Sequence, residues 1–186
     1  MKTIYRILPV LIIAFFLSCS SSKSPELTAE QIKELDEIVS NKSIEFKARW
    51  ARPLTSTSLN RIASAGLIEP SSNINNIDMT TNQNYFRMVG DSVMAYFPYF
   101  GEIQLGGGYY PQNNNGIQFN GIPQNFSVDK DKKGYKIRFN IKDNTETYQV
   151  NAQLFANKKA VLNINSSHRT PITYSGNFDE FQEKSE

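Results

Sequence analysis

Strict alternation of apolar and polar residues marks the second half of the chain. In three segments apolar side chains occupy every second position, with charged or amide side chains between them: Tyr135, Ile137, Phe139 and Ile141; Tyr148, Val150, Ala152 and Leu154; Ala160, Leu162 and Ile164. A period of two predicts strands that bury one face. The polar turns at 142–144 and 157–158 are so short that they can join only antiparallel neighbours.

The first folded element that we expect is a helix. Thr28 and Gln31 have the spacing of a capping box, and apolar residues then recur at helical spacing: Ile32, Leu35, Ile38 and Val39. After the helix the period changes to two. This change predicts a strand whose buried face carries Ile44, Phe46, Ala48 and Trp50.

Shorter signals predict further strands. Val89-Gly90-Asp91-Ser92 is typical of a tight hairpin, with glycine at the first central position of a type II′ turn. Phe126 with Val128 marks one more strand, and Ile172 with Tyr174 marks the last. The predicted fold class is mainly β: an antiparallel meander that forms a barrel-like sheet or sandwich, with one N-terminal helix. We expect a single domain over residues 28–178, followed by a polar tail at 179–186.

The N-terminal segment predicts export and a lipid anchor. Residues 1–18 combine basic Lys2 and Arg6 with a short apolar run, as a secretory signal does. Cys19, the single cysteine, follows this run directly and is the expected lipidation site. Residues 19–27 form a polar tether. We therefore expect the protein in the bacterial cell envelope, anchored to the membrane by lipid, with its domain in the periplasm.

The charge balance excludes one class of partner. The chain has 20 basic and 18 acidic residues, and the surplus cations are Lys2 and Arg6 of the signal. Because the mature chain is formally neutral and has no clustered basic run, we expect no nucleic-acid partner.

Candidate catalytic and metal-binding residues are few. His168 is the only histidine and follows Ser166 and Ser167, but no recognised nucleophile motif surrounds it, so we interpret it as a polar turn residue. Residues 129–134 resemble the start of a calcium loop, but Lys133 would place a cation among the ligands. We interpret this segment as a solvated hairpin turn. The sequence predicts no catalytic residue, no metal and no cofactor.

The segment from Tyr96 to Gly116 is the candidate binding region, because aromatic rings beside amides suit sugars, peptides and protein surfaces. Its predicted binding residues are Tyr99, Tyr109, Tyr110, Asn113, Asn114 and Asn115. The sequence favours a non-catalytic module that binds an envelope glycan, a peptide or a protein. The alternative is an envelope hydrolase whose catalytic groups are assembled only in space.

Several motifs occur in an order that resembles one known family. They are Phe46-Lys47-Ala48, Tyr85-Phe86 before Gly90-Asp91-Ser92-Val93, Phe97-Pro98-Tyr99-Phe100-Gly101, Gly116-Ile117-Gln118-Phe119 and Tyr174-Ser175-Gly176. This order is similar to that of the family named domain of unknown function 4251, over roughly residues 44–178. The resemblance implies a lipid-anchored or exported envelope protein of a Gram-negative bacterium. It implies no catalytic residue, because the family has no assigned activity.

Overall fold

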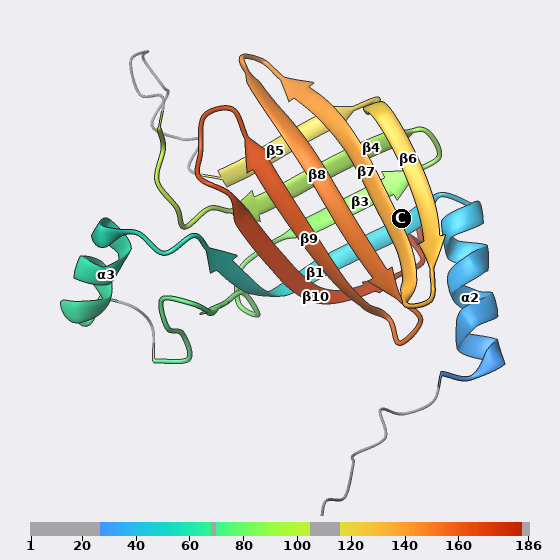
Figure 1. Cartoon of the computed structure of the whole chain (residues 1–186), viewed down its shortest axis with the longest axis horizontal. Coiled ribbons are helices and arrows are strands. Elements are labelled where there is room, and N and C mark those ends of the chain that lie inside the picture. The colour runs from blue at the N-terminus through green and yellow to red at the C-terminus, as the bar shows by residue number, and fades with distance from the viewer. Residues whose placement is uncertain (1–26, 68–69, 105–115, 184–186) are drawn as a thin grey trace, which may run out of the picture.

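The alternating segments fold into one antiparallel sheet, as the sequence predicts. The computed structural model describes residues 27–67, 70–104 and 116–183. Its ten strands are β1 (Ser43–Pro53), β2 (Ile77–Asp78), β3 (Tyr85–Val89), β4 (Ser92–Pro98), β5 (Gly116–Gly121), β6 (Gln124–Asp131), β7 (Gly134–Asp143), β8 (Glu146–Phe155), β9 (Lys159–Ser166) and β10 (Ile172–Asp179). The sheet order is β5-β4-β3-β1-β10-β9-β8-β7-β6, with β2 paired to β1. The sheet curls into a half-barrel, so that β7 and β8 cross in front of β3 to β5 (Figure 1).

The core lies inside this curl, where aromatic side chains from the two halves meet. Phe139 on β7 is 1% exposed, and its ring centroid lies 6.0 Å from that of Phe86 on β3 and 6.3 Å from that of Phe119 on β5. Phe97 on β4 stacks on Tyr174 of β10 with centroids 4.4 Å apart. These contacts fix the two halves of the sheet against each other. The predicted mainly β fold is therefore confirmed.

Helix α2 (Ala29–Ser40) begins with the predicted capping box. Thr28 Oγ1 accepts a hydrogen bond from the Gln31 N–H, and the Gln31 side chain accepts one from the Thr28 N–H. The helix buries Leu35, Ile38 and Val39, whereas Ile32, in the first turn of the same apolar stripe, is 39% exposed. The helix lies beside the β6–β7 edge (Figure 1), where Asp36 accepts hydrogen bonds from Lys130 and Tyr135.

Strand β1 contains a bulge that the alternation did not predict. Its register against β10 shifts between Ala48 and Trp50, so that Ala48 and Ala51 are both buried. The two residues between them, Arg49 and Trp50, then lie on the outer face. Trp50 is therefore half-buried on the outside of the sheet, and its predicted place in the core is wrong. On β10, a Cβ at Gly176 would come within 2.0 Å of the Lys47 carbonyl oxygen, so this approach requires glycine.

The segment between β1 and β3 holds two elements without a sequence prediction, α3 (Thr57–Ser64) and β2. Beyond β2, the buried side chain of Asn84 takes the place of a strand along the open edge of β1. Its Oδ1 accepts the Ala48 N–H at 2.7 Å, and its Nδ2 lies 3.2 Å from the Ala48 carbonyl oxygen and 3.3 Å from that of Met79. The amide thus satisfies backbone groups that would otherwise be buried without partners.

The predicted turns are confirmed. Gly90 has a φ of +57° in the β3–β4 hairpin. Residues 129–134 form the β6–β7 hairpin, in which Asp131 Oδ1 accepts the N–H groups of Lys133 and Gly134. After β10, Phe181 is held to β1 by two hydrogen bonds with Ser43. No helix in the described part of the chain is both long and apolar enough to span a bilayer.

Candidate functional site

An apolar pocket lies between α3 and the segment that follows β4. It has a volume of about 360 Å³ and is lined by Leu59, Ile62, Leu67, Ser72, Ile77, Asp78, Asn82, Phe100 and Gly101. This volume falls within the range of about 300–1,000 Å³ that is typical of small-molecule sites. In Figure 1, α3 and α2 lie on opposite sides of the sheet, so the pocket is far from the N-terminal end of the domain.

Local sequence builds the α3 side of the pocket. Ser56 caps the helix, because its side chain accepts the Leu59 N–H at 3.2 Å. Leu59 and Ile62 are three residues apart and therefore share one helix face. Leu59 is 8% exposed, but Ile62 and Leu67 are 44% and 75% exposed. The pocket thus presents aliphatic side chains that the domain itself leaves partly uncovered.

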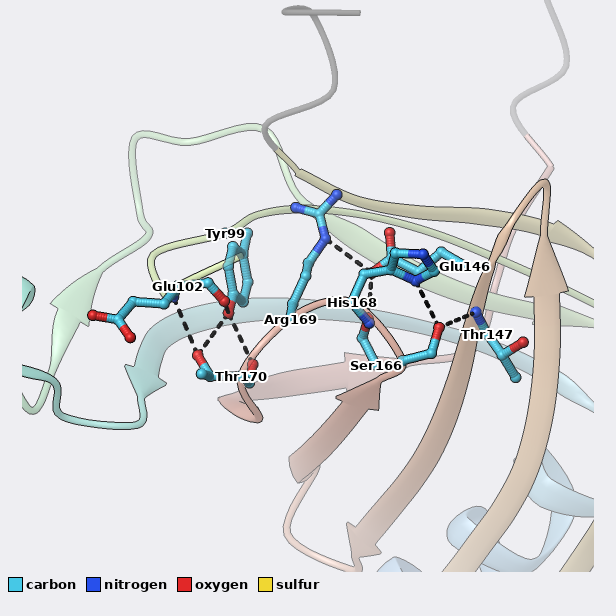
Figure 2. A network of polar contacts seen from close by, with 9 residues as sticks. Tyr99, Glu102, Glu146, Thr147, Ser166, His168, Arg169 and Thr170 are labelled. Atoms are coloured by element: carbon cyan, nitrogen blue, oxygen red, sulfur yellow. Dashed lines mark hydrogen bonds and ion pairs between the residues drawn. The ribbon is translucent and has the colours of Figure 1, made fainter. Parts of the chain in front are cut away.

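The opposite wall, Phe100 and Gly101, directly follows Tyr99, whose hydroxyl is held by Glu102 and Thr170 (Figure 2). The Tyr99 hydroxyl lies 3.0 Å from the Glu102 carbonyl oxygen, 2.9 Å from the Thr170 carbonyl oxygen and 2.8 Å from Thr170 Oγ1. A Cβ at Gly101 would come within 2.2 Å of that hydroxyl, so only glycine allows the turn to close over it. Burial raises the pKa of Tyr99, so the hydroxyl remains a donor to a higher pH than that of an exposed tyrosine.

Backbone hydrogen bonds extend this connection along the chain. The Thr170 N–H donates to the Glu102 carbonyl at 3.0 Å, and the Gln104 N–H donates to the His168 carbonyl at 2.7 Å. Residues 99–104 are therefore docked on the β9–β10 connection. The position of that connection in turn determines where Phe100 meets the pocket.

A buried ion pair holds the β9–β10 connection in place. Arg169 Nε lies 2.9 Å from Glu146 Oε1, and the two side chains are 3% and 9% exposed. Ser166 Oγ donates to the same carboxylate oxygen. The Arg169 guanidinium also lies 5.2 Å from the centroid of the Tyr99 ring. Glu146 thus links the start of β8 to the residues that hold Tyr99.

The serine and histidine residues lie beside this ion pair. Ser167 Oγ is 2.7 Å from His168 Nδ1 and also accepts the Thr147 N–H at 3.0 Å. Ser166 Oγ accepts the His168 N–H at 2.9 Å. Each hydroxyl therefore accepts a backbone N–H, which is the arrangement of a polar turn. In the described part of the chain, no three His, Cys, Asp or Glu side chains are placed to hold a metal ion.

The structure places only one of the predicted binding residues. Tyr99 lies on the core side of the pocket wall with its hydroxyl bonded as described above. Tyr109, Tyr110, Asn113, Asn114 and Asn115, like the lipidation site Cys19, lie outside the described residues, so their predicted roles stay predictions.

Sequence reasoning missed the pocket residues on α3. The signal was present, because Ser56 is a typical N-cap and Leu59 and Ile62 have helical spacing. The surrounding Ser and Asn residues made this segment resemble a loop.

The pocket has a chemistry suited to binding. Among the described residues that line it, Asp78 is the only titratable one. Asp78 Oδ1 accepts hydrogen bonds from the Thr80 side chain and the Thr80 N–H, which lower the pKa of Asp78. Its carboxylate is therefore engaged with its own loop and adds one negative charge to the otherwise uncharged lining that the structure describes.

The curled single sheet with one helix at its edge defines the class of protein: an antiparallel half-barrel domain. The model of the family described as domain of unknown function (DUF4251) matches residues 26–178, and the chain belongs to this family. The fold is similar to the crystal structure of a DUF4251 family protein from Bacteroides eggerthii, with a TM-score of 0.54 and 15% identity. The likeness covers 82% of this chain and 89% of that chain. No curated protein matches the sequence.

Proposed function

We propose that this protein is a lipid-anchored envelope module that binds, without catalysis, an apolar side chain of a peptide or protein partner in the α3 pocket. The observation that carries the proposal is the partly uncovered aliphatic lining of a pocket of about 360 Å³. When a partner covers this apolar surface, the complex is stabilised by about 25 cal/mol for each Å² removed from water.

The lining favours a peptide over a glycan at this pocket. Four of the apolar side chains are aliphatic, and Phe100 supplies the one aromatic ring among the described lining residues. Sugars usually require exposed aromatic faces, whereas aliphatic pockets suit leucine-like side chains. Ser72, Asn82 and the Gly101 backbone offer hydrogen-bonding groups beside the apolar surface, as a peptide main chain requires.

The pocket can be tested with a minimal peptide mimic. We expect N-acetyl-leucinamide to shift the methyl resonances of Leu59, Ile62 and Ile77, with a dissociation constant on the order of millimolar for so small a ligand. N-acetyl-glycinamide, which has the same amides and no aliphatic side chain, should leave these resonances unshifted. Methyl NMR titration of the labelled protein measures both.

Two substitutions control this experiment. Ile62→Glu places a charge in the pocket and should abolish the shifts. Ile122→Glu changes an isoleucine that is 75% exposed and does not line this pocket, so it should leave them intact. The pocket proposal fails if the wild type shows no saturable shifts, or if both variants lose them equally.

The anchor is a separate part of the proposal. The support for it is the sequence of residues 1–27, with Cys19 directly after the apolar run. Cys19→Ser should release the protein from the membrane and leave its melting temperature unchanged, because a polar tether separates residue 19 from α2. Membrane fractionation and thermal melting measure these effects. A variant that stays in the membrane pellet through an alkaline wash would refute lipidation.

A further inference from the structure

A second hollow lies beside the 79–84 loop, along the outer face of β1. This groove has a volume of about 770 Å³ and is polar, with lining residues that include Lys47, Arg49, Thr80, Asn82, Gln83 and Asn177. The side chains of these six residues are exposed. Amides and hydroxyls that both donate and accept hydrogen bonds suit a ligand with many hydroxyl groups.

The bulge in β1 places an aromatic side chain next to a residue of the groove. It places Arg49 and Trp50 next to each other on the outer face, where regular alternation would have buried one of them. The arginine guanidinium lies 5.9 Å from the centroid of the indole. The geometry is built into the fold, because Gly176 allows the close approach of β10 and Asn84 closes the edge of β1.

The charges of the groove favour an acidic ligand. Its two carboxylates are already paired with cations: Glu45 lies 2.7 Å from Arg87 Nη2 and 3.7 Å from Lys47 Nζ, and Asp179 lies 2.8 Å from Lys158 Nζ. Arg49 also lines the groove; its charge contributes to the lowered pKa of Asp78, but the two side chains form no ion pair within 4.0 Å. A guanidinium presents parallel donors that match a carboxylate in a bidentate way.

We propose that this groove binds a carboxylate-bearing saccharide chain. Arg49 takes the carboxylate, and the amides of Gln83 and Asn177 bond to sugar hydroxyls. Trp50 does not line the groove itself, but its ring lies 5.9 Å from the Arg49 guanidinium and offers an apolar face to a sugar that extends past Arg49. This site shares Asn82 with the α3 pocket, but it does not require the peptide partner proposed for that pocket.

The single tryptophan of the chain makes the proposal directly measurable. Hexagalacturonate, an acidic oligosaccharide, should change the fluorescence of Trp50 in a saturable way. Maltohexaose, a neutral chain of the same length, should bind at least tenfold more weakly. Because the contact is partly ionic, the affinity for hexagalacturonate should fall as salt is raised.

Variants separate the groove from general surface charge. Arg49→Gln should weaken binding of hexagalacturonate at least tenfold. Arg49→Lys keeps the charge but loses the paired guanidinium donors, so its affinity should lie between those of the wild type and Arg49→Gln. Arg138→Gln removes an exposed arginine on β7, outside the groove, and should bind as the wild type does. Ile62→Glu should also bind normally, which distinguishes failure of this site from failure of the α3 pocket. Each variant is compared only after its melting temperature has been shown to match the wild type.

Three results would overturn the proposal. These are the absence of saturable binding by the wild type, equal affinity for the acidic and neutral chains, and an equal loss in Arg49→Gln and Arg138→Gln. The last result would mean that any surface cation attracts the acidic chain.

Discussion

Replacing Arg169 by methionine is expected to lower the free energy of unfolding by about 3–5 kcal/mol, because it leaves the Glu146 carboxylate buried without its cation. Arg169 and Glu146 are 3% and 9% exposed, so water cannot replace the lost partner. Urea unfolding of the two proteins measures the difference. The exposed pair Arg138–Asp129 provides the matched comparison, and Arg138→Met should cost about 0–1 kcal/mol.

The double variant Glu146→Gln/Arg169→Met tests the cause. The double variant has no buried carboxylate without a cation, so it should be more stable than Arg169→Met alone. If the two are equally unstable, the loss comes from packing and not from an unpaired charge. Because Thr170 follows Arg169 and holds Tyr99, the single variant should also shift the methyl resonances of the α3 pocket.

Phe139→Asp is expected to abolish cooperative folding, whereas Arg138→Asp should destabilise the domain by no more than about 1 kcal/mol. The two residues are neighbours on β7, but Phe139 is 1% exposed and contacts rings from β3 and β5. Arg138 points to solvent and pairs with Asp129. Thermal melting followed by circular dichroism compares them. Similar melting temperatures would contradict the assignment of the two faces.

Local patterns account for what could be predicted from the sequence. Strands β7 to β9 alternate without interruption and are joined by short turns, so their faces and pairing follow from neighbouring residues alone. The capping box of α2 is equally local. Trp50 was misplaced because the bulge depends on Gly176, a residue on another strand. The sequence of β1 alone therefore does not show where the bulge lies.

The candidate site was hidden for the same reason. Glu146 and Arg169 are separated by 23 positions, and Tyr99 and Thr170 by 71, so nothing in the chain order shows that they meet. The sequence did draw attention to Tyr99 and to His168, both of which lie in this network. It could not show that the Tyr99 hydroxyl bonds to the backbone, because that depends on how residues 99–102 dock on the β9–β10 connection.

The place of β1 between β3 and β10 has a consequence for the order of folding. Most strands pair with a neighbour in the chain, so hairpins such as β7–β8 can form early and quickly. The β1–β10 pairing instead joins the two ends of the domain, as the contact between Ser43 and Phe181 across 138 positions shows. Closing so long a loop carries a larger entropic cost than closing a hairpin, so this pairing is expected to form later. The sheet is therefore completed only after the last strand is available, and a chain that ends before β10 leaves one edge of β1 open.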